Sequence, residues 1–144
     1  TLVIENKVEL LSATLEQAYF DIAHCANALD HSYDPVRGIE EMLRVVRPGR
    51  PIFLQHFRNT GMLTRYQGLH QWNLDVRDWN FVAWQPNRSS TSNANQSLFG
   101  DVIVNLNDHL LTLGLIEPNS IQMRLSKVVD EEEGVLDWLD VVIW

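Results

Sequence analysis

Three histidines and two neighbouring polar residues are the side chains of this sequence best suited to chemistry. Asn27, Asp30 and His31 lie in a turn-rich stretch that follows a β-prone, mostly apolar segment, whereas His56 ends a second such segment and His70 lies further along the chain. Imidazole accepts or donates a proton near neutral pH, and a carboxylate can orient it. We take His31, His56 and His70 as candidate bases, and a structural or surface histidine explains each of them singly as well.

A strand, loop, helix, turn and strand position these residues. The segment Tyr19–Cys25 reads as a strand, and Asp34-Pro35 is a typical helix start, with Asp34 as N-cap and Pro35 at the first helical position. Pro48-Gly49 ends the helix, and a second strand follows over Pro51–Phe57. The apolar side chains between these limits recur at helical spacing: Val36, Ile39, Met42, Leu43 and Val46. This order predicts a βαβ unit with parallel strands and a right-handed crossover, and ligands of such sheets bind where the strands end.

The other predicted elements are less regular. In chain order they are a strand over Val8–Leu11, a short helix within Arg58–Gln71, a strand over Phe81–Trp84, an exposed flexible loop over 85–97, a helix over Val104–Ile116 capped by Asn105, and an antiparallel hairpin of Ile121–Val129 and Trp138–Trp144. We expect one domain over residues 1–144.

Composition and charge exclude several classes of protein. The chain has 144 residues, of which 45% are hydrophobic and 21% charged, and its net charge is −8. It is therefore expected to be globular, and its acidity argues against nucleic acid as a partner. The densest basic group is interpreted as a solvated helix face: Arg37, Arg44, Arg47 and Arg50. No apolar run is long enough to span a membrane, and the single cysteine, Cys25, fits a cytoplasmic location.

Two motifs in order carry a resemblance to a known family. Phe20-Asp21 is followed by Leu29-Asp30-His31, and then Leu43-Arg44-Val45-Val46-Arg47-Pro48-Gly49 leads into the second strand. This combination resembles class I S-adenosylmethionine-dependent methyltransferases, in which these motifs flank the fourth and fifth strands. The segment Gly68–Asn73 resembles one seen in some bacterial members. The resemblance covers most of residues 8–144.

The resemblance implies a fold, a cofactor and a set of site residues. The fold is an α/β, partial Rossmann-like sheet, mainly parallel with an antiparallel C-terminal hairpin. The cofactor is S-adenosylmethionine and the acceptor a small molecule. Apart from the resemblance, no metal is expected, because His31, His56 and His70 have no recognised ligand spacing. The residues implied to bind the cofactor are Thr14, Cys25, Ala26, Asn27, Asp30 and His31. Those implied to bind the acceptor are His70, Gln71, Trp72 and Asn73, and the base is His31, His56 or His70.

The chain departs from the family at the cofactor-binding motifs. It contains no GxGxG loop and no βαβ half before Val8. The close approach of the protein backbone to the cofactor and the carboxylate contact to its ribose are therefore missing. Arg50 replaces the usual glycine after Pro-Gly, and Ala13 stands where the family often has an adenine-binding aspartate. We expect a truncated domain whose Tyr19–Cys25 strand has an open edge, which favours a homo-oligomer. The alternative is a non-catalytic relative that serves as a binding or oligomeric module.

Overall fold

A βαβ unit forms the centre of the structure, as predicted. The computed structural model describes residues 4–87, 101–131 and 134–144. In it, β1 (Ala23–Ala26) and β2 (Ile52–Phe57) run parallel, joined through α2 (Pro35–Val45). The side chain of Asp34 caps the helix by accepting a hydrogen bond of 3.0 Å from the backbone N–H of Arg37. The predicted N-cap and first helical residue are therefore confirmed.

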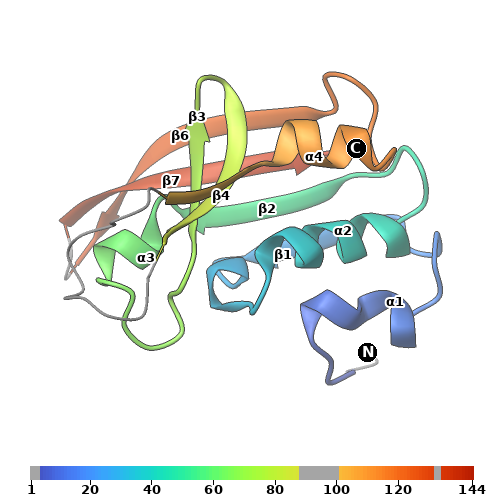
Figure 1. Ribbon diagram of the computed structural model, residues 1–144, viewed down its shortest axis with the longest axis horizontal. Helices are drawn as coiled ribbons and strands as arrows, with labels where there is room; N and C mark the ends of the chain where they lie inside the picture. Colours follow the sequence, from blue (N-terminus) through green and yellow to red (C-terminus); the bar gives the residue numbers. More distant parts are fainter. Residues whose placement is uncertain (1–3, 88–100, 132–133) are drawn as a thin grey trace.

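The sheet that contains this unit is mixed rather than mainly parallel. The C-terminal hairpin of β6 (Ile121–Asp130) and β7 (Gly134–Ile143) is confirmed, and the strand order is β1-β2-β7-β6 (Figure 1). This is the order that the resemblance implies for the last four strands of the family. The expectation of a mainly parallel sheet is wrong, because β7 lies between β2 and β6 and pairs antiparallel with both. Only β1 and β2 are parallel among the paired strands described here.

A second, antiparallel sheet consists of β3 (Asn73–Arg77), β4 (Asn80–Pro86) and β5 (Asp101–Asn105). The predicted strand over Phe81–Trp84 is the middle of β4, whereas β3 and β5 were missed. β3 is short, and two of its polar side chains, Asn73 and Asp75, are buried, so its pattern does not stand out in the sequence. Of the loop predicted over 85–97, residues 85 and 86 belong to β4, and 88–97 lie outside the described residues.

Two further helices match predictions in part. The short α3 (Thr60–Leu63) lies within the range expected for it. The helix α4 (Leu106–Thr112) is shorter than predicted, because its first expected residue, Val104, belongs to β5. Its cap is confirmed, since Asn105 accepts hydrogen bonds from the N–H groups of Asn107 and Asp108.

The predicted strand over Val8–Leu11 is wrong. This segment forms the 3-10 helix η1 (Val8–Leu10) and the short helix α1 (Leu11–Thr14), which lie against α2 on the side away from the sheet (Figure 1). A side chain at Gly38 of α2 would meet Val8 at 3.0 Å, so the glycine leaves the space in which Val8 packs. In the described ranges of the chain the segment has no neighbouring strand to pair with, and it forms helical hydrogen bonds instead.

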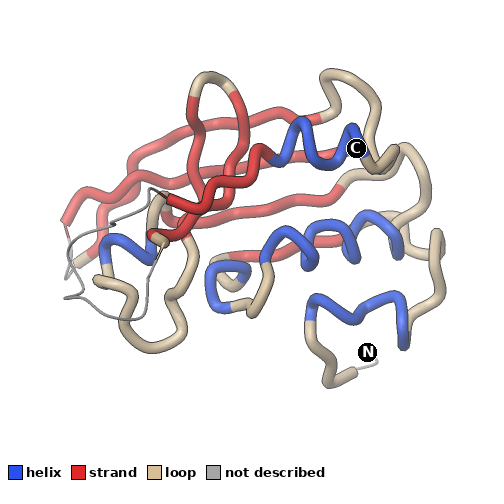
Figure 2. The backbone as a smooth tube through the Cα atoms, in the orientation of Figure 1, coloured by secondary structure: helices blue, strands red, loops and turns tan. Residues whose placement is uncertain are grey.

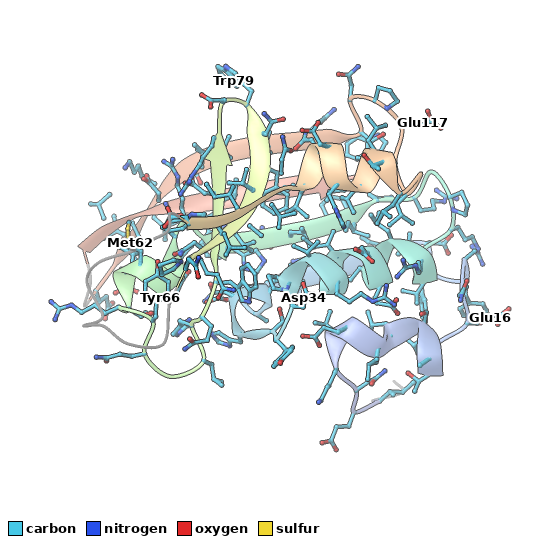
Figure 3. All side chains as sticks on the ribbon, in the orientation of Figure 1. Glu16, Asp34, Met62, Tyr66, Trp79 and Glu117 are labelled. Atoms are coloured by element: carbon cyan, nitrogen blue, oxygen red, sulfur yellow. The ribbon has the colours of Figure 1, made fainter. Side chains whose placement is uncertain are left out.

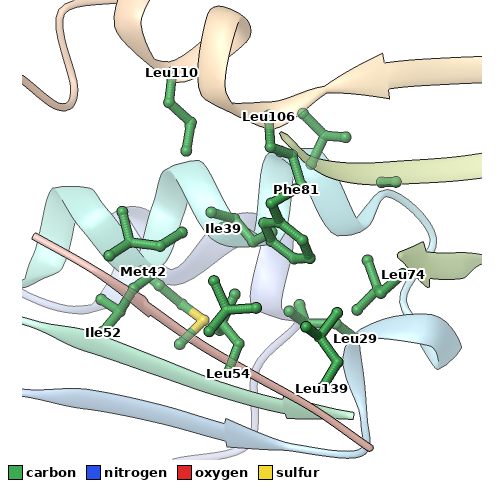
Figure 4. Close-up of a cluster of buried hydrophobic side chains, with 14 of the residues drawn as sticks. Leu29, Ile39, Met42, Ile52, Leu54, Leu74, Phe81, Leu106, Leu110 and Leu139 are labelled. Carbon is green, nitrogen blue, oxygen red and sulfur yellow. The ribbon is translucent and has the colours of Figure 1, made fainter. Parts of the chain in front are cut away.

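One apolar core joins the two sheets and the helices. Alternate residues of β2 and β7 point to the same side, where they meet apolar side chains of α2, α4 and β4 (Figure 4). Buried members include Ile39 and Met42 of α2, Leu54 of β2, Phe81 of β4 and Leu110 of α4. The helices and the second sheet thus cover one face of the four-stranded sheet (Figure 2). None of the described helices is both long and apolar enough to cross a membrane.

Candidate functional site

The candidate site lies where β1 and β2 end, at the rim predicted from the sequence. Asp30 and His31 belong to the 3-10 helix η2 (Leu29–His31), which follows β1. The loop that precedes β3 packs over this turn. The N–H of Gln71 donates to the carbonyl of Asp30 at 3.2 Å, and the indole N–H of Trp72 donates to the carbonyl of Tyr33 at 3.3 Å. Residues 30 and 70, far apart in sequence, therefore meet.

Three side-chain atoms converge at the centre of this rim. Nδ1 of His70 lies 2.6 Å from Oδ2 of Asp30 and 3.0 Å from Nε2 of His31. The third side of the triangle, from Nε2 of His31 to Oδ2 of Asp30, is 3.7 Å. Asp30 is only 2% exposed, whereas the side chains of His31 and His70 are about a third exposed. We call Asp30, His31 and His70 the rim triad.

Buried polar atoms without a hydrogen-bond partner gather next to the triad. Within the described part of the chain, they are Oδ1 of Asn27, Oδ1 of Asp30, and both ring nitrogens of His56. A buried polar atom that lacks a partner is costly, so such atoms mark positions where a ligand, ion or water completes the structure. Asn27 also has a positive φ of 46°, the left-handed conformation that turns the chain sharply after β1.

His56 is buried in β2 and differs from the other two candidate bases. It is 1% exposed. Burial lowers the pKa of His56, and although the carboxylate of Asp30 raises it and His31 lowers it further, the net result is about 4. A buried, neutral imidazole is not open to an acceptor molecule from solution. The structure therefore favours a structural role for His56 over the predicted role as base.

The residues predicted to bind the cofactor are only partly brought together. Asn27, Asp30 and His31 lie at the rim, and Cys25 and Ala26 are the last residues of β1 before it. Burial raises the pKa of the Cys25 thiol, so it is protonated and suited to packing rather than to nucleophilic attack. Thr14 lies elsewhere: its hydroxyl accepts from Asn6 at 2.6 Å, at the far end of the α1 segment.

The residues predicted to bind the acceptor divide in the same way. His70 belongs to the rim triad, and Trp72 lies half-buried beside it. Gln71 donates to the carbonyls of Tyr66 and Gly68, and so holds its own loop together. Asn73 is fully buried and donates to the carbonyl of Trp84, so it cannot contact a molecule in the site.

A shallow open cavity of about 330 Å³ adjoins His31. It is lined by Lys7, Val8, Glu9, Ala28, His31, Ser32 and Tyr33. The N-terminal part of this lining was missed in the sequence, since Val8 was assigned to a strand. Glu9 is held in place by the N–H of Asp34, which donates to its carboxylate at 3.0 Å. Burial raises the pKa of Glu9, but hydrogen bonds from Asp34 and Tyr33 outweigh it and leave the pKa below its usual value.

The basic group on and after α2 is not a free anion-binding surface. Arg37 and Arg44 both pair with Glu40 and Glu41, the nearest contact of each being 2.7 Å, to Glu41. Arg47 pairs with Asp21 at 2.5 Å. Arg37 and Arg44 thus lie on α2 with their charges neutralised by carboxylates, whereas Arg47 lies beyond the end of the helix.

The comparisons with known proteins identify one segment. Residues 3–54 match the family model described as "Methyltransferase domain". This segment contains η1 to the start of β2, and therefore Asn27, Asp30 and His31, and it amounts to just over a third of the chain. No curated protein matches.

Similar solved structures include a SAM-dependent methyltransferase from Methanosarcina mazei, at 17% identity and a TM-score of 0.48, with 97% of this chain and 64% of that chain covered. A protein from Pyrococcus horikoshii OT3 matches at 15% identity and a TM-score of 0.36, with 90% of this chain and 57% of that one covered. The chain thus spans less than two thirds of the length of both. The resemblance read from the sequence is confirmed by the family match over residues 3–54, and the protein is methyltransferase-like.

Proposed function

We propose that this chain contributes the acceptor side of an S-adenosylmethionine-dependent methyltransferase that acts on a small molecule. The observation that carries the proposal is the rim triad, which lies within or beside the segment that matches the methyltransferase family. The cavity beside His31 has the volume of a small-molecule site.

The residues at the rim fit one end of the cofactor. Oδ1 of Asn27 and Oδ1 of Asp30 are buried acceptors without a partner in the described residues. Acceptor oxygens, one of them anionic, suit the positively charged ammonium and sulfonium groups of S-adenosylmethionine. The 144 residues hold no glycine-rich loop for the rest of the molecule. We propose that this part of the site is supplied by residues outside them.

When bound, S-adenosylmethionine supplies a methyl group on an electrophilic sulfonium. The chain's own task is to align the acceptor and to handle its proton. His31 and His70 are the exposed members of the rim triad, and the buried carboxylate of Asp30 orients His70 at 2.6 Å. We propose the triad as the centre that activates the acceptor. We also propose a cytoplasmic location, which the single cysteine, Cys25, fits.

Calorimetric titration with S-adenosylhomocysteine tests the cofactor side of the proposal. We expect measurable binding that weakens by about tenfold, or roughly 1.4 kcal/mol, in N27G, since one hydrogen bond to a charged group is lost. Glycine keeps the positive φ of 46° at this position. N119G is the matched control, because Asn119 has a φ of 65° and lies in an exposed turn.

Two results would contradict the proposal. If folded wild-type protein shows no binding, the rim residues do not hold the end of the cofactor that the proposal assigns to them. If N27G and N119G bind equally well, Asn27 does not contact the cofactor.

The second candidate function is a non-catalytic oligomeric module. It is favoured by the face of the sheet opposite the core, where Phe57 and Trp138 stack edge to face at 4.8 Å and are only half-buried. On the same face, Gln55 donates to Asp140 at 2.9 Å and faces His24 at the same distance. An open sheet face beside an open strand edge fits association with a second copy.

A further inference from the structure

We propose that the rim triad is a binding site for a divalent metal ion. Its ligand atoms are Oδ2 of Asp30, Nε2 of His31 and Nδ1 of His70, which all lie within 4.8 Å of one another. Two imidazoles and one carboxylate form a common ligand set for Zn²⁺, Mn²⁺ and Fe²⁺. The inference deepens the proposed function, because an ion here would lie at the centre that activates the acceptor.

The distances around the triad do not suit hydrogen bonds alone. A ring nitrogen carries either one hydrogen or one lone pair, so Nδ1 of His70 makes one ordinary hydrogen bond. It nevertheless has two partners, at 2.6 and 3.0 Å. If Nδ1 of His70 carries a hydrogen and donates it to Asp30, Nε2 of His31 is left without a good partner. If Nδ1 instead accepts from His31, its lone pair also faces the carboxylate of Asp30.

A cation at the centre resolves this conflict, because all three atoms then offer electron pairs to it. Ligand atoms about 2.1 Å from one ion lie roughly 3.0–3.4 Å apart in octahedral or tetrahedral geometry. The three separations in the triad, 2.6, 3.0 and 3.7 Å, bracket these values. Small side-chain rotations are sufficient to equalise them.

The surroundings of the triad also favour a metal site. The second oxygen of Asp30 is buried and has no hydrogen-bond partner in the part of the chain that the structure describes. His31 and His70 are partly exposed, so an ion bound between them has coordination positions open toward solvent and the neighbouring cavity. Three protein ligands with open positions are typical of catalytic rather than structural metal sites.

Such an ion changes how an acceptor loses its proton. A hydroxyl bound to a divalent cation has a lowered pKa, as metal-bound water does. His31 and His70 then serve as ligands rather than as bases, and the proton leaves to solvent. The site therefore favours acceptors with an oxygen that can bind a metal.

Titration of the chain, free of any histidine tag, with Zn²⁺ and Mn²⁺ tests the proposal. We expect calorimetry to show one ion per chain for wild type, with affinity at least about tenfold weaker in H31Q and in H70Q. H24Q is the matched control, because His24 is exposed on β1 and pairs with Gln55 outside the triad. In NMR spectra, the ring signals of His31 and His70 are expected to change on metal addition, while those of His24 and His109 do not.

Absence of binding by folded wild-type protein would overturn the proposal, as would equal binding by all four proteins. Circular dichroism establishes that each variant is folded. Metal binding is measured without S-adenosylhomocysteine, so its failure is distinguishable from failure of the cofactor titration. Cofactor binding without metal binding would leave His31 and His70 as proton-transfer groups, and the proposed function would stand.

Discussion

His56 is the residue whose environment has the clearest energetic consequence. It is buried in β2 with a pKa of about 4, against 6.5 for histidine in an unfolded chain. The unfolded state therefore binds a proton as the pH falls below about 6.5, while the folded state does not until about pH 4. The contribution of neutral His56 to the free energy of unfolding is fully present above the unfolded pKa, and it is lost as the pH falls through this range.

Replacement of His56 by leucine is expected to remove this pH dependence. The shift corresponds to roughly 3 kcal/mol of unfolding free energy between pH 6.5 and pH 4. Urea denaturation at several pH values measures it, with H24L as the control because His24 is exposed. If H56L and wild type lose stability in parallel over this range, the burial of the neutral His56 imidazole does not contribute to the pH dependence of stability.

At the scale of elements, α3 and the loop after it position His70. The N–H of Gly61 donates to the carbonyl of Trp72 at 3.2 Å, and its own carbonyl accepts from Tyr66 at 2.6 Å. A Cβ atom at Gly61 would lie 2.8 Å from that backbone carbonyl of Trp72, which is too close. The glycine therefore permits the close approach that brings the loop over η2. Tyr66 lies beside α3, whereas Trp79 lies at the distant tip of the β3–β4 hairpin (Figure 3).

G61A is expected to destabilise the protein by roughly 1–3 kcal/mol, because the backbone of the loop must move. It should also displace the ring signal of His70 in NMR spectra. The matched control is G38A, whose added Cβ meets only side-chain atoms, those of Val8 and Leu29 at 3.0–3.3 Å. Side chains adjust more easily than backbone, so a smaller loss is expected. Equal effects of the two substitutions would contradict this account of the loop.

At the scale of the whole molecule, the four-stranded sheet has an open edge at β1 among the residues that the structure describes. The N–H groups of Ala23 and Asn27 donate toward β2, to Pro51 and Gln55. Since N–H groups alternate in direction along a strand, that of His24 points away from β2. This edge agrees with the one expected from the sequence, and its use by a second copy stays a prediction.

Light scattering after gel filtration is expected to show a dimer or a larger species at micromolar concentration. H24P removes an N–H from the open edge without removing one that β2 uses, so it should shift the protein toward monomer. H24Q keeps the N–H and serves as the control. Monomeric wild-type protein, or a dimer that H24P leaves intact, would rule out association through this edge.

The helices α2 and α4 could be predicted from the sequence because the residues that begin and cap them act within a few positions along the chain. Asp34-Pro35 determines where α2 begins, the apolar spacing from Val36 to Val46 determines the face that it buries, and Asn105 caps α4. These are contacts within a few residues, and they need no knowledge of the rest of the chain. The motifs around Asp30 and His31 likewise identified the rim of the site.

The tertiary structure alone decided the arrangement of distant segments. No local pattern in the sequence indicates that Val8 packs in a helix beside Gly38 or that His56 faces inward. Above all, His70 lies 40 residues along the chain from Asp30, and their meeting depends on a loop held by Gly61. Such contacts arise from pairing and burial over long separations, which local patterns do not encode. The sequence thus determined the elements and the candidate residues, and folding decided which of them form one site.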